Sequence, residues 1–258
     1  MKRIVLALLA VMMVLSLVAC GGAATTEEKT SPSAGEETSV MTYAEYQAAA
    51  LQAKVCVETY VQAKQGWWEK EGVGGVATFY TQNEEGAYFL YDMPCTKEQY
   101  DALTTGTKIR VTGYKAEFSG EIEIIDATYE VLEGSFTATA KDVTALLGTE
   151  DLIKEMNKFA SFKGMTVAAS KNAEGEDVAY LYKWNGSGKE GDDLYFNVSL
   201  GENTYTFTVE SYLCGADSDV YKAVKELKIG DKIDMEGFLY WYEGVNPHIT
   251  SVTKVVEG

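Results

Sequence analysis

Few side chains in this sequence are arranged for catalysis. The only histidine is His248, at the start of a strand-like segment, and a serine or cysteine nucleophile needs a histidine base beside it. We interpret His248 as a hydrogen-bonded structural residue. The acidic pairs Asp192-Asp193 and Asp217-x-Asp219 fit a solvated loop and a helix cap. No phosphate loop or nucleophile elbow is present. We therefore expect no enzymatic activity, no cofactor and no metal site.

Two aromatic clusters are better candidates for binding. Trp67-Trp68 follows a strand-like run, and Tyr240-Trp241-Tyr242 lies in a second loop before Gly244. Aromatic faces stack on sugar rings and on bases. Because consecutive strand residues point to opposite faces, only part of each cluster can line one site. The alternative is that these side chains pack the folded units together.

The charge of the chain restricts its partners. The formal net charge is −17 at pH 7, which repels phosphate backbones and anionic headgroups. We therefore expect no nucleic-acid partner, and we expect the aromatic loops to bind a glycan or a peptide.

The first residues predict export. Met1-Lys2-Arg3 precedes an apolar run from Ile4 to Val18, and Leu17-Val18-Ala19-Cys20 is followed by two glycines. A basic head, a short apolar segment and small residues before a cleavage site are typical of a secretory signal. The Leu-x-Ala-Cys ending resembles the lipobox of bacterial lipoproteins. The resemblance implies that the signal is cut before Cys20 and that Cys20 carries a diacylglyceryl group. The alternative is an ordinary secretory signal.

The segment after the signal differs in composition from the rest of the chain. Residues 21–40 are small, polar and acidic and show no apolar periodicity, which indicates a flexible tether. Apart from Cys20 the cysteines are Cys56, Cys95 and Cys214, and an odd number leaves their pairing open. Cys56 lies in a strand-like run and is interpreted as a buried structural thiol.

The body of the chain contains an internal repeat. Residues 103–131 align without gaps on residues 227–255, and three pairs of glycines coincide: Gly106 with Gly230, Gly113 with Gly237, and Gly120 with Gly244. Shared glycines indicate shared backbone geometry, because glycine permits bulges and positive φ at low cost. Each copy reads as three strands, a short helix and two further strands. Thr96-Lys97-Glu98-Gln99 predicts a capping box at the first of these helices.

This order of elements resembles the OB-fold, a small Greek-key barrel. We expect an all-β protein with a few short helices, built of two tandem OB-fold-like five-stranded barrels; a β-sandwich is the alternative. The expected organisation is a signal at 1–19, a tether at 20–42, domains at 43–136 and 161–258, and a helical linker at 137–160.

These interpretations combine into one prediction. The protein is expected to be anchored by lipid to the extracytoplasmic face of the cell membrane and to act as a binding or adaptor protein of the cell envelope. The alternative is a structural, protein-interacting subunit of an envelope complex. The residues expected to bind are Trp67, Trp68, Tyr240, Trp241 and Tyr242.

Overall fold

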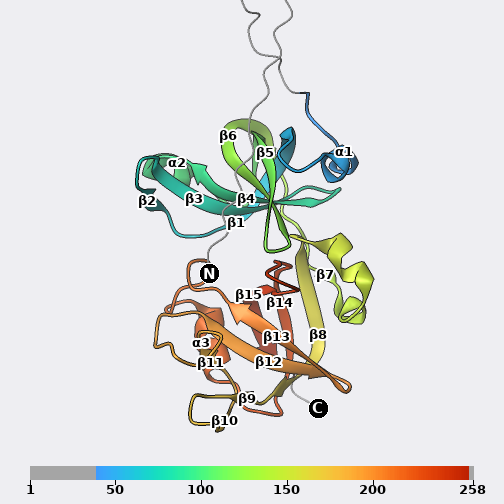
Figure 1. Cartoon of the computed structure of the whole chain (residues 1–258), viewed down its shortest axis with the longest axis vertical. Helices are drawn as coiled ribbons and strands as arrows, with labels where there is room; N and C mark the ends of the chain where they lie inside the picture. The colour runs from blue at the N-terminus through green and yellow to red at the C-terminus, as the bar shows by residue number, and fades with distance from the viewer. Residues whose placement is uncertain (1–38, 256–258) are drawn as a thin grey trace, which may run out of the picture. The chain divides into compact units, whose positions relative to one another are not determined.

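The computed structural model describes residues 39–255, whose strands form two successive β-barrels (Figure 1). The predicted signal, Cys20 and the tether as far as residue 38 lie outside the described residues, and those expectations stay predictions. Among residues 39–255, no helix combines the length and the apolar character needed to cross a membrane.

The first barrel closes through a ring of five strands. Strand β1 pairs with both β3 and β5, β3 pairs with β4, and β5 pairs with β6. The parallel pairing of β4 with β6 completes the ring. The bounds are β1 Lys54–Lys64, β3 Gly74–Gln82, β4 Ala87–Pro94, β5 Thr107–Phe118 and β6 Glu121–Ser135, with the short β2 Trp68–Lys70 on the edge of β3.

The second barrel repeats this order. Strand β8 pairs with β12 and β14, β12 with β13, β14 with β15, and β13 runs parallel to β15. The bounds are β8 Phe159–Ala168, β12 Leu194–Leu200, β13 Asn203–Val209, β14 Lys232–Phe238 and β15 His248–Lys254. A helix lies between the third and fourth strands of each barrel, α2 Lys97–Ala102 and α3 Asp219–Lys225. Two OB-like barrels are therefore confirmed.

The remaining elements connect or extend the barrels. Helix α1 Tyr43–Ala48 precedes the first barrel. The segment between the barrels contains β7 Lys141–Asp142 and the 3-10 helices η1 Thr144–Leu146 and η2 Glu150–Glu155. Three two-residue strands occupy the insertion between β8 and β12: β9 Ser170–Lys171, β10 Asp177–Val178 and β11 Leu181–Tyr182.

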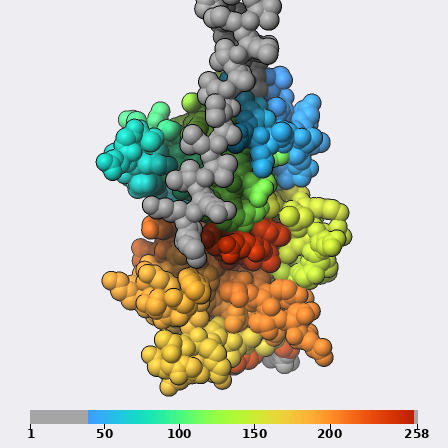
Figure 2. Space-filling model, viewed as in Figure 1, coloured from blue at the N-terminus to red at the C-terminus, as the bar shows by residue number. Residues whose placement is uncertain are grey.

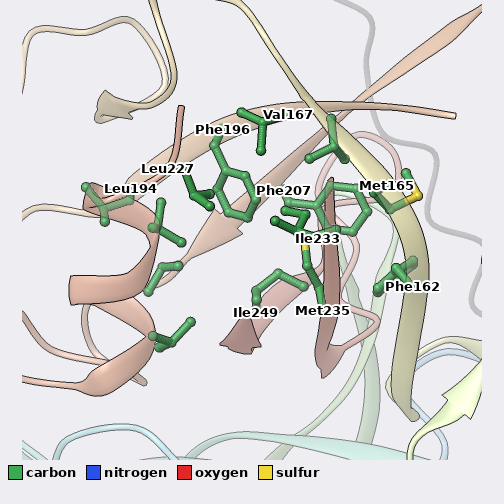
Figure 3. Packing of buried hydrophobic residues seen from close by; sticks show 14 of the residues in the cluster. Phe162, Met165, Val167, Leu194, Phe196, Phe207, Leu227, Ile233, Met235 and Ile249 are labelled. Carbon is green, nitrogen blue, oxygen red and sulfur yellow. The ribbon is translucent and has the colours of Figure 1, made fainter. Parts of the chain in front are cut away.

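Each barrel encloses its own apolar core. Strands β8, β12, β13, β14 and β15 of the second barrel turn alternate apolar side chains inward, and Leu227 closes one end after α3 (Figure 3). Helix α3 buries Val220 and Val224 against this core. In the first barrel, the predicted capping box starts α2: the Thr96 hydroxyl accepts from the Gln99 N–H, and the Gln99 side chain accepts from the Thr96 N–H. The cysteine side chains at 56 and 95 are buried and free.

The segment before the second barrel differs from our expectation. We expected a helical linker at 137–160, whereas the 3-10 helix η2 ends at Glu155. Asn157 then adopts a positive φ of 67°. A right-handed helix cannot continue through a residue in this conformation. Phe159 already belongs to β8, where it pairs with Phe238 of β14. The first strand of the second barrel therefore begins inside the expected linker, because pairing with β14 extends it as far as Phe159.

The repeated glycines have matching roles in the two barrels. Gly113 and Gly237 each lie at a register shift between the fourth and fifth strands. A Cβ atom on Gly113 would lie 2.6 Å from Ile124 Cγ2, and one on Gly237 would lie 2.2 Å from the His248 carbonyl oxygen. These distances are too short for any side chain, so the bulge requires glycine at both positions.

The close approach at Gly237 leads to a stability prediction. Gly237→Ala should lower the free energy of unfolding by about 1–3 kcal/mol, because the new methyl group must displace backbone rather than a flexible side chain. Urea unfolding at neutral pH measures this change. Gly215→Ala is the matched control, since the nearest atom to its Cβ would be Asp217 Oδ1 at 3.4 Å. Equal stability of the two variants would contradict the assignment.

Candidate functional site

The two barrels meet through an aromatic cluster. Both belong to one compact unit of the chain. Tyr80 and Phe89 of the first barrel are buried against Phe238 of the second, with 4.6 Å between the ring centroids of Tyr80 and Phe238. Tyr240 packs on Phe89 at 5.2 Å. Figure 2 shows the surface of the segment after β14, in red, against the green surface of the β5–β6 hairpin.

A hydrogen-bonded chain crosses this junction. The Gln65 amide lies 3.4 Å from the Tyr80 hydroxyl, which in turn lies 2.6 Å from Nδ1 of His248. The short contact joins the Tyr80 hydroxyl to Nδ1, and the tautomer of the imidazole sets which of the two donates. Burial lowers the pKa of His248 to about 3, so the ring is neutral. His248 is thus a hydrogen-bonded structural histidine, as predicted.

A cavity of about 340 Å³ opens beside the junction. Its walls combine aromatic rings with two carboxyl groups and contain no lysine or arginine. We call it the inter-barrel cavity; it is lined by Gln65, Phe89, Tyr91, Phe118, Glu123, Glu210, Tyr240 and His248. Its volume lies within the range of small-molecule sites, about 300–1,000 Å³.

Glu123 is the group in this cavity that the fold leaves unused. It lies on β6 in register with Phe89 of β4, so the two side chains share one face. The residue is 8% exposed, and within residues 39–255 its carboxyl group has no hydrogen-bond or ion-pair partner. Burial, with a smaller contribution from the negative charge of Asp92, raises the pKa of Glu123 to about 7. A buried polar group without a partner is costly unless a ligand supplies one.

Glu210 has a structural role as well as a place in the cavity. Its two carboxyl oxygens accept hydrogen bonds from the Tyr212 N–H at 3.1 Å and the Leu213 N–H at 2.9 Å. These bonds stabilise the turn that follows β13. Burial still raises the pKa of Glu210 to about 7, although the two backbone donors act in the opposite direction. Glu210 therefore adds a second carboxyl group to the lining of the cavity, and its position is fixed by these two hydrogen bonds.

The aromatic residues selected from the sequence are not gathered at one site. Tyr240 lines the inter-barrel cavity and stacks on His248, with ring centroids 4.3 Å apart. Trp241 is half-buried at the edge of the second core. Tyr242 is 49% exposed and pairs with Phe118.

The tryptophan pair lies on the first barrel. The indole of Trp67 packs against the first core and donates a hydrogen bond of 2.9 Å to the Cys95 carbonyl oxygen. Trp68 is 46% exposed on the short edge strand β2. Binding through these residues stays a prediction, and Tyr240 is the member that the fold brings to the inter-barrel cavity.

Sequence reasoning missed the acidic residues of the cavity. Glu121-Ile122-Glu123-Ile124 alternates acid and isoleucine, a pattern that normally turns the acids to solvent. In the structure, the second barrel covers the face that carries Glu121 and Glu123. No local signal reveals this covering, because it comes from a segment more than a hundred residues further along the chain.

Comparison with known proteins identifies no family. No protein-family model and no curated protein sequence matches the chain. A murine DNA-binding protein bound to double-stranded DNA is 12% identical over 79% of this chain and 97% of that chain, with a TM-score of 0.35. The Ifi202 HINa domain in complex with 20-base-pair double-stranded DNA is 12% identical over 78% of this chain and 98% of that chain, at 0.34. A replication protein A heterotrimer bound to single-stranded DNA is 10% identical over 80% of this chain and 49% of that chain, at 0.30.

These structures correct two expectations. We excluded nucleic acid as a partner because of the net charge, and for the same reason we preferred a glycan or a peptide as the ligand of an envelope binding or adaptor protein, with a structural subunit as the alternative. The three structures described above are nucleic-acid complexes, and the exclusion of a nucleic-acid partner does not stand. The physical reason is that net charge is a sum over the chain, whereas binding depends on local potential. At these TM-scores the likeness carries no particular ligand over to this chain.

The neutral imidazole at the junction predicts a specific acid sensitivity. The pKa of His248 is lowered on folding, so its contribution to stability is present above the unfolded value of 6.5 and declines as pH falls towards 3. The stability advantage of the wild type over His248→Gln should shrink by about 2–3 kcal/mol between pH 7 and pH 4.5. Urea unfolding at the two pH values measures it. A stability difference between the wild type and His248→Gln that does not change with pH would contradict the neutral, buried state of His248.

Proposed function

We propose that this protein is a non-catalytic binding protein whose ligand is a small organic cation held in the inter-barrel cavity. The observation that carries the proposal is Glu123, a buried residue that lines the cavity and whose carboxyl group has no hydrogen-bond or ion-pair partner among the described residues. An ammonium group placed there would supply the missing partner.

The other walls favour the same chemistry. Aromatic rings attract cations through their negative faces, and four of them, Phe89, Tyr91, Phe118 and Tyr240, line the cavity. Glu210 contributes a second carboxyl group. The lining has no cationic side chain to hold an anion.

The cavity provides binding groups but lacks a catalytic arrangement. His248 is neutral, and its Nδ1 is engaged by Tyr80, so it is not placed as a base beside a nucleophile. Tyr240 stacks on this fixed ring, which keeps one aromatic wall rigid. A preformed wall lowers the entropy that binding must overcome.

Binding and protonation are linked at Glu123. Because the pKa of Glu123 in the free protein is about 7, a large share of the molecules carry a neutral carboxyl group at pH 6. A bound cation favours the ionised form, so the affinity should rise as pH increases through 7. This direction distinguishes a carboxylate-held cation from a ligand held by apolar contact alone.

Removal of the Glu123 charge tests the proposal. Glu123→Gln should weaken binding of choline, tetramethylammonium or a short diamine at least tenfold, since one partner of a buried charge pair is lost. Isothermal titration calorimetry at pH 7.5 on the folded chain measures the affinities. Glu202→Gln is the matched control, because it removes the same charge from an exposed hairpin turn and should leave affinity unchanged.

Two results would overturn this function. Equal binding of choline and its neutral analogue 3,3-dimethylbutan-1-ol would show that charge plays no part. Tight binding of a labelled single-stranded or duplex oligonucleotide, measured by fluorescence anisotropy, together with no response to any ammonium probe, would replace the proposal with nucleic-acid binding.

We propose separately that Cys20 carries a lipid anchor on the extracytoplasmic face of the membrane. The support is the lipobox-like Leu17-Val18-Ala19-Cys20 sequence. Cys20→Ala should move the protein from the detergent phase to the aqueous phase in Triton X-114 partition, because stable anchoring needs acyl chains. Mass spectrometry of the mature amino terminus should find Cys20 first and acylated. An unmodified amino terminus at another residue would refute the anchor.

A further inference from the structure

Glu121 is the most deeply buried carboxyl group at the barrel junction. It is the first residue of β6, and its side chain is completely buried. Its Oε2 accepts a hydrogen bond of 2.9 Å from the backbone N–H of Trp241, which belongs to the second barrel. Its Oε1 is buried and has no partner. One backbone donor is too little to stabilise an ionised carboxylate at such a site.

This hydrogen bond holds two walls of the inter-barrel cavity together. Glu121 lies two residues before Glu123, and Trp241 follows Tyr240, so each partner is continuous with a cavity-lining residue. Two further bonds cross the same seam. The Glu243 N–H donates to the Ser119 carbonyl at 2.7 Å, and the Asn157 amide donates to the Ile122 carbonyl at 3.1 Å.

No cation balances Glu121 among residues 39–255. The Lys115 ammonium group donates hydrogen bonds to the carbonyls of Tyr46, Gln47 and Ala49, and Lys158 pairs with Glu155. The titratable and charged groups on the surrounding elements are Tyr43 and Tyr46 of α1, Tyr80 of β3, Lys115 and Glu117 of β5, Glu123 of β6, Glu155 and Lys158 before β8, and Tyr240 and Glu243 after β14.

The electrostatics of this site favour the protonated acid. Burial, with a further contribution from the charge of Glu123, raises the pKa of Glu121 to about 8, although the Asn157 amide and the Trp241 N–H act in the opposite direction. The pKa is raised above its ordinary value of 4.5, so the stabilisation is complete below 4.5 and is lost as pH rises through 8.

We propose that Glu121 is a proton-operated latch, which holds the Trp241 segment against β6 while protonated and opens the inter-barrel cavity when it ionises. The ionised carboxylate must recruit water or leave the junction, and either event separates the cavity walls. The effect on ligand affinity rests on the proposed function, whereas the effect on the junction does not.

The isosteric variant Glu121→Gln tests the latch, since a glutamine keeps the hydrogen bond from Trp241 and cannot ionise. Choline affinity of the wild type should increase from pH 6 to pH 7.5 and then fall about tenfold by pH 9, where about a tenth of Glu121 stays protonated. In Glu121→Gln, choline affinity should still increase from pH 6 to pH 7.5 but should no longer fall between pH 7.5 and pH 9. Glu123→Gln, the matched control two residues away, should reduce the increase in choline affinity and keep the fall, since Glu210 still ionises near pH 7.

A second measurement is independent of any ligand. Hydrogen exchange of the Trp241 amide, corrected for intrinsic rates, should accelerate about tenfold between pH 7 and pH 9 in the wild type and stay constant in Glu121→Gln. If no ammonium probe binds but this contrast is present, the latch stands and the proposed function fails. Parallel acceleration in both proteins would overturn the latch. A carbon-13 titration of the Glu121 carboxyl group in the wild type that places its pKa below 6 would also do so.

Discussion

The removal of water from the seam between the two barrels is the constraint on which the site depends. Tyr80, Phe89 and Phe238 exclude solvent there, and the hydrogen bond between Tyr80 and His248 fixes one barrel against the other. Dehydration then determines the protonation state of the buried groups His248, Glu121, Glu123 and Glu210. It makes His248 a neutral imidazole, and it raises the pKa of Glu121, Glu123 and Glu210 because no lysine or arginine neutralises them.

The three buried carboxyl groups differ chiefly in the number of donors that the fold provides. Glu210 receives two backbone N–H groups and stabilises a turn. Glu121 receives one, which is sufficient for a neutral acid and insufficient for an ionised one. Glu123 receives none and faces a cavity. The number of donors therefore separates the structural role of Glu210 from the switching and binding roles proposed for Glu121 and Glu123.

The internal duplication explains why the seam forms where it does. The β5–β6 turn at Gly120 and the loop at Gly244 are equivalent positions of the repeat, and the two loops contact each other through Glu243 and Ser119. The barrels differ between their first and second strands, where the second carries the insertion with β9, β10 and β11. The two barrels therefore contact each other through equivalent loops. The insertion with β9, β10 and β11 lies in a different segment of the second barrel.

The sequence by itself determined the two barrels, their strand order and the glycine bulges, because alternation, caps and glycine placement are local properties of the chain. It also predicted the structural role of His248. Its charge argument about partners was wrong, since a sum over residues contains no positions. Only the tertiary structure decided that Glu121 and Glu123 are buried, that Tyr240 lines a cavity and that Trp67 does not. These outcomes depend on contact between residues far apart in the chain, and neither strand periodicity nor composition encodes which surface a second barrel will cover.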